Sequence, residues 1–310
     1  MKKSSKTGSF TTYMKRYWQL YVMLLLPMTY LFIFKYLPME YVQIAFKDYN
    51  ITKSVWEMPW TSNHGMKYFA QAFSNRDFLY AVRNTLRLNI LDLIVGFPVP
   101  IIFAIILNEL RVPRFKKCVQ TIAYMPHFLS WVIISSLALQ LFAPSSGLIN
   151  MVIQNLGGDP VPFLNESNHW MFTYLFIGVW QSFGWNSIVY LAAITGISPE
   201  LYEAASVDGA SRWRKIWHIT LPGLKPTIVV LLIMNLGNIL GSNFDRPFAM
   251  QNNMVMDVAN VISTFVYTHG IKGLKFSLTT AVGLFQSVVG VIFLLLANWI
   301  SRKLGERGIM

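Results

Sequence analysis

The sequence predicts an all-α integral membrane protein whose six membrane-spanning helices leave both chain ends in the cytosol. Three observations predict this class. Hydrophobic residues make up 54% of the 310 residues and charged residues only 13%, a composition typical of membrane proteins. Several apolar runs approach or exceed the roughly 20 residues that cross a bilayer. Lysine and arginine collect in short segments beside these runs, as the positive-inside rule predicts for cytosolic loops.

The first span is predicted at about 18–37, after a cytosolic tail formed by residues 1–17. The tail contains five basic residues and no acidic residue: Lys2, Lys3, Lys6, Lys15 and Arg16. The apolar run is long enough to span, and no small-residue cleavage site follows it, so we interpret it as a retained span and not a signal peptide. The aromatic-rich segment 38–83, in which acids offset most bases, is predicted to lie outside.

Five further apolar runs complete the predicted bundle. The basic turn Arg111–Lys117 after the second span is predicted to be cytosolic. Segment 143–169 contains no lysine or arginine and is therefore expected outside. The predicted spans two to six cover about 84–107, 119–142, 170–194, 226–244 and 278–300.

Residues 18–300 thus form one transmembrane domain, followed by a cytosolic tail at 301–310. The loop charges agree with this topology except in the last outer segment, where three bases oppose two acids: Arg246, Lys272 and Lys275 against Asp245 and Asp257. We interpret the net charge of +12 as topological, so nucleic acid is not an expected partner.

No catalytic or metal site is predicted. The five histidines fall in different loops or at span ends, without metal-ligand spacing: His64, His127, His169, His218 and His269. The lone Cys118 excludes an internal disulfide. The chain contains no phosphate-binding Gly-x-x-x-x-Gly-Lys-Ser/Thr loop. If ATP drives this protein, another subunit must bind it.

Asp92 lies within the second predicted span, where an ionised carboxylate is costly unless it is paired or hydrated. Arg87 is five residues away and not on the same helix face, so the expected partner is Asn89 or a group on another span. Asp92 could line a pathway or fasten two helices together. We favour the fastening role.

A set of amide, aromatic and acidic side chains lies along the later spans. Amides and indoles inside spans can hydrogen-bond hydroxyl groups, and aromatic faces stack on sugar rings, so the set suits a carbohydrate. Joining helices to one another is the alternative role, since Asn and Gln commonly do so in membranes. The candidates are Trp185, Asn186, Tyr190, Asn235, Asn238, Asn243, Asp245 and Gln286.

Segment 199–222 is predicted to form a helix–turn–helix elbow between the fourth and fifth spans. A helix begins at Pro199, since proline is tolerated at the first helical position. Gly209 permits a sharp turn, and a second short helix is expected to stop at Pro222. A soluble partner could dock on this elbow. An amphipathic loop lying on the membrane surface is the alternative.

The elbow has the pattern Glu-Ala-Ala, three residues, Gly, nine residues, Ile-x-Leu-Pro. This pattern resembles the EAA loop of permease subunits in type I ATP-binding-cassette (ABC) importers, which docks into a groove of a cytosolic ATPase. The resemblance implies the type I permease fold. It also implies that the coupling residues are Glu203, Ala204, Ala205, Asp208 and Gly209.

Other stretches resemble more narrowly the sugar permeases that import oligosaccharides cut from polysaccharides such as alginate or pectin. These stretches are Gln43–Tyr49, Ala123–Phe128, Asn243–Asp245, Val266–Tyr267 and Thr280–Ser287. The likeness covers most of the chain.

The resemblance implies several partners: a second homologous permease, two ABC ATPases that bind ATP and Mg²⁺, an extracellular solute-binding protein and an oligosaccharide. The chain itself would hold no cofactor, would not be an enzyme, and would be a multi-pass protein in contact with lipid in the cytoplasmic membrane of a prokaryote. An ion-coupled secondary transporter and an integral-membrane enzyme of glycan or lipid metabolism are the alternatives. Neither explains the Glu203 motif.

Overall fold

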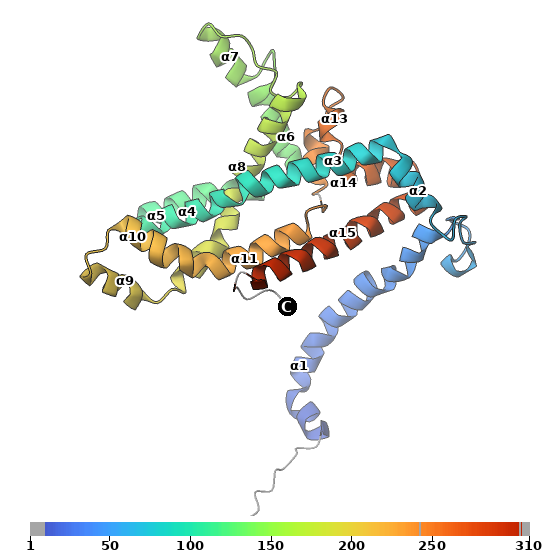
Figure 1. The fold of residues 1–310 in the computed structure, drawn as a ribbon, viewed down its shortest axis with the longest axis horizontal. Coiled ribbons are helices and arrows are strands. Elements are labelled where there is room, and N and C mark those ends of the chain that lie inside the picture. Colours follow the sequence, from blue (N-terminus) through green and yellow to red (C-terminus); the bar gives the residue numbers. More distant parts are fainter. Residues whose placement is uncertain (1–9, 242, 304, 306–310) are drawn as a thin grey trace, which may run out of the picture.

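The structure is a computed structural model that describes residues 10–241, 243–303 and 305. Over this part of the chain it is helical, with one isolated antiparallel bridge between Lys47 and Trp60 and no strand. Long helices form the body, with α9 and α10 at one end and α2 at the other (Figure 1). The α-helices are α1 (Phe10–Leu31), α2 (Lys67–Ser74), α3 (Arg76–Leu91), α4 (Pro98–Glu109), α5 (Pro113–Tyr124), α6 (Trp131–Phe142), α7 (Leu148–Asn155), α8 (Ser167–Thr195), α9 (Pro199–Val207), α10 (Arg212–Lys215), α11 (Leu221–Gly237), α12 (Asp245–Met250), α13 (Met256–Ala259), α14 (Ile262–Val266) and α15 (Phe276–Lys303).

Tighter and wider helical turns connect several of these helices. The 3₁₀ segments are η2 (Leu37–Phe46), η3 (Val55–Glu57) and η5 (Met125–Phe128). The π segments are η1 (Phe32–Tyr36), η4 (Asp92–Gly96), η6 (Ile216–Thr220) and η7 (Tyr267–Lys272).

Within the described residues, four continuous helical stretches have the length and hydropathy of a membrane span. They are Thr12–Phe46, Arg76–Glu109, Arg212–Gly237 and Phe276–Lys303. Helix α8 has 29 residues but is not among the four, and its Trp, Tyr, Gln and Asn side chains lower its hydropathy. The all-helical class is thus confirmed, whereas the number of six spans remains a prediction.

The third predicted span, 119–142, is not a straight helix. It consists of two helical pieces, Pro113–Phe128 and Trp131–Phe142, that meet at 102°. Leu129 is extended, and Ser130 accepts a hydrogen bond from the backbone N–H of Ile133 at 3.4 Å, which starts a new helix. The capping serine therefore breaks a run that hydropathy alone presents as continuous.

The expected stop at Pro222 is wrong. Helix continues from Arg212 to Gly237, so the helix that contains the fifth predicted span begins well before Pro226. Pro222 falls in the first two positions of α11, directly after the π turn η6. A π turn widens the backbone spiral, which accommodates a ring that would otherwise clash one turn back.

Helix α1 points away from the helical body (Figure 1), and none of its most apolar window is buried. Its backbone leaves helical geometry at Tyr17, next to the predicted start of the span at 18. The following segment is attached to the start of α15, because the Ser277 hydroxyl donates to the Lys47 carbonyl at 2.8 Å and accepts from the Tyr49 N–H at 3.1 Å. Residues 1–9 of the expected tail, and 304 and 306–310 at the other end, lie outside the described residues.

A buried apolar cluster joins α4, α8 and α11. It contains Ile101, Ala104, Tyr190, Ile194 and Leu224, and Ala104 and Leu224 are completely buried. Because α8 leads into α9 and α11 follows α10, this cluster fixes the two helices that flank the elbow relative to each other.

Candidate functional site

A cavity of about 450 Å³ lies between α3–α4, α8 and the end of α11. Six of the eight residues proposed from sequence for a carbohydrate pathway line it: Trp185, Asn186, Tyr190, Asn235, Asn238 and Asn243. Asp245 and Gln286 are not in its wall. Asp245 begins α12 and is exposed, and Gln286 donates to the carbonyl oxygen of Leu240.

Helical spacing brings these side chains together. Trp185 and Val189 are four residues apart on α8, and Leu231 and Asn235 are four apart on α11, so each pair shares one helix face. Asn238 follows as the residue that ends α11. The amide nitrogen of Asn235 donates to the carbonyl of Leu231 at 2.8 Å, which leaves its oxygen available as an acceptor. The wall therefore combines amide groups with aromatic surfaces.

The indole of Trp185 is held in a fixed orientation. His127 stacks on it with 4.6 Å between ring centroids and 4° between planes, and Phe128 meets it edge-on at 5.6 Å. Trp185 nevertheless remains 41% exposed, so part of the ring faces the cavity. Gly184, the residue before Trp185, lets the end of α5 approach α8 closely, because an added Cβ would lie 2.0 Å from the carbonyl oxygen of Ala123.

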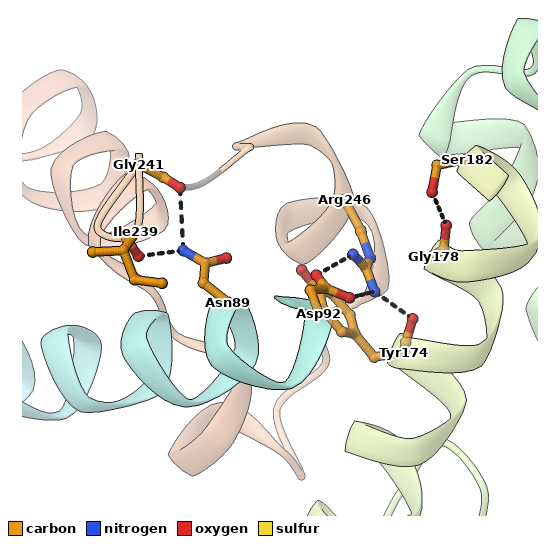
Figure 2. Close-up of polar contacts among 8 residues, drawn as sticks. All are labelled: Asn89, Asp92, Tyr174, Gly178, Ser182, Ile239, Gly241 and Arg246. Atoms are coloured by element: carbon orange, nitrogen blue, oxygen red, sulfur yellow. Dashed lines mark hydrogen bonds and ion pairs between the residues drawn. The ribbon is translucent and has the colours of Figure 1, made fainter. Parts of the chain in front are cut away.

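Asp92 is paired with Arg246, a residue on another segment of the chain. Nη1 of Arg246 is 2.7 Å from one carboxylate oxygen, and Nη2 is 3.4 Å from the other (Figure 2). Nη2 also donates to the carbonyl of Tyr174 at 2.7 Å, and the guanidinium lies 3.7 Å from the centre of the Tyr174 ring. Asn89, the partner considered on the same helix, donates instead to the carbonyls of Ile239 and Gly241.

The sequence alone does not mark Arg246 as a site residue, because it falls among the charges of a predicted loop. Its side chain is only 11% exposed, and Asp92 neutralises it. Without Arg246, the segment predicted as the last outer one has two bases and two acids, so its exception to the charge bias disappears. A base in a loop predicted to be outside, together with an acid in a span without a partner, was the signal that could have identified the pair.

The elbow at the end of the bundle has the predicted turn. Gly209 has φ +71°, in the left-handed region, and an added Cβ would meet nothing within 4 Å. The N–H of Ala210 donates to the carbonyl of Ala205 at 2.8 Å and closes the turn. Ser198 occupies the position before α9, but its side chain makes no capping bond.

The two arms of the elbow are tied together. Lys215 Nζ donates to Ser206 Oγ at 2.6 Å, and the hydroxyls of Tyr202 and Thr220 are 3.0 Å apart. The proposed coupling residues are at the surface: Glu203, Ala204, Asp208 and Gly209 are exposed and Ala205 is half-buried. The elbow is therefore a braced, accessible projection.

Comparison with known proteins identifies relatives along nearly the whole chain. The chain is 42% identical to Protein LplB of Bacillus subtilis over 306 residues, which are 99% of this chain and 95% of the relative. It is 44% identical to the polygalacturonan/rhamnogalacturonan transport system permease protein YteP of the same species over 290 residues, covering 94% and 89% of the two chains.

Solved structures of transporter chains are similar to this chain over nearly its whole length. A chain of a bacterial ABC transporter involved in the import of the acidic polysaccharide alginate superimposes with a TM-score of 0.85 at 40% identity, covering 94% of this chain and 98% of that chain. A chain of a bacterial alginate ABC transporter, in complex with an alginate pentasaccharide-bound periplasmic protein, superimposes with a TM-score of 0.86 at 39% identity, covering 97% and 99%.

The resemblance inferred from the Glu203 motif is confirmed by these relatives and by a match over residues 81–306 to a family described as the inner membrane component of binding-protein-dependent transport systems. The match includes the cavity and the elbow and covers well over half of the chain. The chain therefore belongs to the family of binding-protein-dependent transport system inner membrane components.

Proposed function

We propose that this chain is a permease subunit that moves oligosaccharides, cut from an acidic polysaccharide, through the cytoplasmic membrane of a bacterium. The observation that carries the proposal is the cavity, in which Trp185 and amides from two helices converge. Amide groups can both donate hydrogen bonds to sugar hydroxyls and accept them, and an indole face packs on a sugar ring. Relatives named for polygalacturonan and alginate transport support this substrate class.

The proposed topology has six crossings and cytosolic ends. Helix α8 and the bent pair around Ser130 add two crossings to the four apolar stretches. The basic turn Arg111–Lys117 and the bases next to the elbow then lie on the cytosolic side. The cavity lies between that side and the outer segments.

The elbow is the proposed docking site for a cytosolic ATPase, which binds ATP and Mg²⁺. Leu201 and Val207 are 53% and 89% exposed and offer apolar contact area, while Glu203 and Asp208 offer acceptors to basic groups. A second permease is proposed to complete the pathway, and an extracellular solute-binding protein to deliver the saccharide. ATP-driven movement of the elbow would rock α8 and α11 and alternate the access of the cavity.

The test is ATP-dependent uptake of trigalacturonate into proteoliposomes containing the tagged chain and the subunits that copurify with it. An ATPase and a second permease are expected in the preparation, whereas recovery of this chain alone would favour a self-sufficient transporter or an enzyme. Gly209→Val should abolish uptake while ATP hydrolysis persists, because valine is strained at φ +71°.

Gly157→Val is the matched control. Gly157 has φ +83° and equally open surroundings, but it lies in the outer segment 143–169. The variant should therefore carry the same kind of backbone strain and keep uptake coupled. Equal uptake in the Gly209 variant and the wild type would count against the coupling role.

A further inference from the structure

A second cavity, of about 170 Å³, adjoins the first. The second cavity is lined by residues 85–92 of the α3–α4 stretch and by residues 174–182 of α8. The first cavity is lined further along the same helices, by residues 89–100 and 178–190. The two cavities thus follow one another in the same order along both helices. Six residues belong to both walls and mark where the two cavities meet, and we call this set the partition: Asn89, Asp92, Gly178, Ser182, Asn243 and Arg246.

The Asp92–Arg246 ion pair is the charged element of this partition (Figure 2). In the proposed orientation, the larger cavity is nearer the cytosol and the smaller one nearer the outside. A saccharide that travels from one cavity to the other must pass this pair. This step rests on the proposed function.

Arg246 has the features of a preformed carboxylate receptor. Its guanidinium is buried, packed over Tyr174 and oriented by the Tyr174 carbonyl. Two of its nitrogens face a carboxylate, and its Nε is buried without a hydrogen-bond partner among the described residues. Guanidinium groups bind carboxylates through such paired, charge-assisted hydrogen bonds.

Asp92 is the more accessible half of the pair. Its side chain is 30% exposed, against 11% for Arg246, and it begins the π turn η4. Such π turns are frequent at functional sites, where a helix departs from its regular hydrogen bonding. The carboxylate is therefore better placed to move away than the guanidinium.

We infer that Arg246 is the residue that makes the pathway selective for acidic saccharides, and that Asp92 is an internal substitute for the carboxylate of the substrate. A uronate group that reaches the partition replaces Asp92 at the guanidinium, so Arg246 exchanges one carboxylate for another. A neutral sugar has no carboxylate to replace Asp92, so the ion pair would have to open and leave Arg246 without a charged partner. Displacement of Asp92 joins the two cavities.

The test compares the two halves of the pair in the complete importer, reconstituted with its binding protein. The probe is trigalacturonate, and its fully methyl-esterified form is the neutral counterpart. Arg246→Gln should raise the apparent KM for trigalacturonate by about tenfold and reduce the preference for the acid over the ester by a similar factor. Asp92→Asn should lower the apparent KM several-fold, because Arg246 no longer has a competing carboxylate.

The decisive feature is that the two substitutions should shift the KM in opposite directions. If the pair were only a structural brace, losing either partner should have the same effect. Gly178→Ala gives an independent test that keeps both charges. Its Cβ would lie 2.1 Å from Cζ of Arg246 and displace the guanidinium, so it should raise the KM as Arg246→Gln does. Gly283→Ala on α15, where an added Cβ meets nothing within 4 Å, is the matched control and should resemble the wild type.

The outcomes separate this inference from the proposed function. If the wild-type importer takes up trigalacturonate but Asp92→Asn and Arg246→Gln shift the KM in the same direction, the selectivity role of Arg246 is wrong and the transport function stands. Absence of uptake of any oligosaccharide by the wild-type importer would overturn the proposed function itself. Unchanged preference for acid over ester in both Arg246→Gln and Gly178→Ala would likewise overturn the inference.

Discussion

Gly184 is the position at which one added methyl group should most clearly disturb the cavity wall. It lies in the long helix α8, one residue before Trp185, where η5 and the end of α5 cross α8. An added Cβ would lie 2.0 Å from the carbonyl oxygen of Ala123 and 3.1 Å from its Cβ. Contacts under 3.0 Å are essentially never seen for real Cβ atoms, so the two segments must separate by about 1 Å or more.

The expected cost follows from three contributions. Overpacking at such a contact costs about 1–3 kcal/mol. Separation also weakens the hydrogen bond from Gln181 to the His127 carbonyl, which is already long at 3.4 Å, and a normal bond of this kind contributes about 1 kcal/mol. Alanine recovers up to about 1 kcal/mol of helix propensity. We therefore expect Gly184→Ala to destabilise the protein by about 1–3 kcal/mol.

The assay is the thermal stability of the purified complex, followed by size-exclusion chromatography after heating, together with uptake of oligosaccharide. Gly184→Ala should lower the midpoint and weaken uptake, because the stack of His127 on Trp185 shifts. Gly283→Ala should leave the midpoint unchanged or raise it, since it has the propensity gain without a contact. If both variants shift the midpoint in the same direction and by the same amount, the close approach at Gly184 is not a constraint.

Three further predictions concern topology, the outer segment and the cavity. Cys118, the chain's single cysteine, is exposed, so a membrane-impermeant maleimide should label this chain in inside-out vesicles and not in right-side-out vesicles; the reverse labelling would invert the topology. Hydrogen bonds from Lys67 and Tyr68 hold the pKa of Asp48 below its usual value, so Asp48 makes a small, solvent-screened contribution to stability above about pH 4. This contribution is lost as the pH falls through the lower pKa of the folded state. The difference in thermal midpoint between the wild type and Asp48→Asn should therefore shrink from about pH 6 to about pH 3, and a constant difference would refute this coupling. Trp185→Ala should raise the apparent KM for oligosaccharide roughly three- to tenfold through loss of ring stacking, and an unchanged KM would exclude the indole from the pathway.

The cavity wall was largely predictable from sequence because its residues follow helical periodicity. Once two spans are assigned, amides and aromatics at intervals of three and four on each must share a face, and six of the eight candidates do line the cavity. Gln286 has the same residue chemistry, but it donates to the carbonyl of Leu240 and is not part of the cavity wall. Type and spacing do not show whether an amide faces a cavity or another helix.

The Asp92–Arg246 pair could not be predicted from local spacing, since the two residues are 154 positions apart in sequence. Only the tertiary fold brings α12 against η4. The break at Ser130 is invisible to hydropathy for a different reason: an apolar run has the same hydropathy whether one helix or two pass through it. The local signals are Pro126 within η5 and the capping Ser130, and an average of hydropathy over the run does not detect them.

The wrong expectation at Pro222 has the largest mechanical consequence. A helix that stopped there would place a joint between the elbow and the fifth span. The structure instead has helix from Arg212 to Gly237, so one continuous helical stretch connects the elbow to Asn235 in the cavity wall. Before the elbow, helix α8 continues from Trp185 in the cavity wall to Thr195, and three residues then lead to α9. The elbow thus joins two consecutive helices that both line the cavity and share the buried cluster around Tyr190 and Leu224. A force applied at the elbow should therefore move these two walls together.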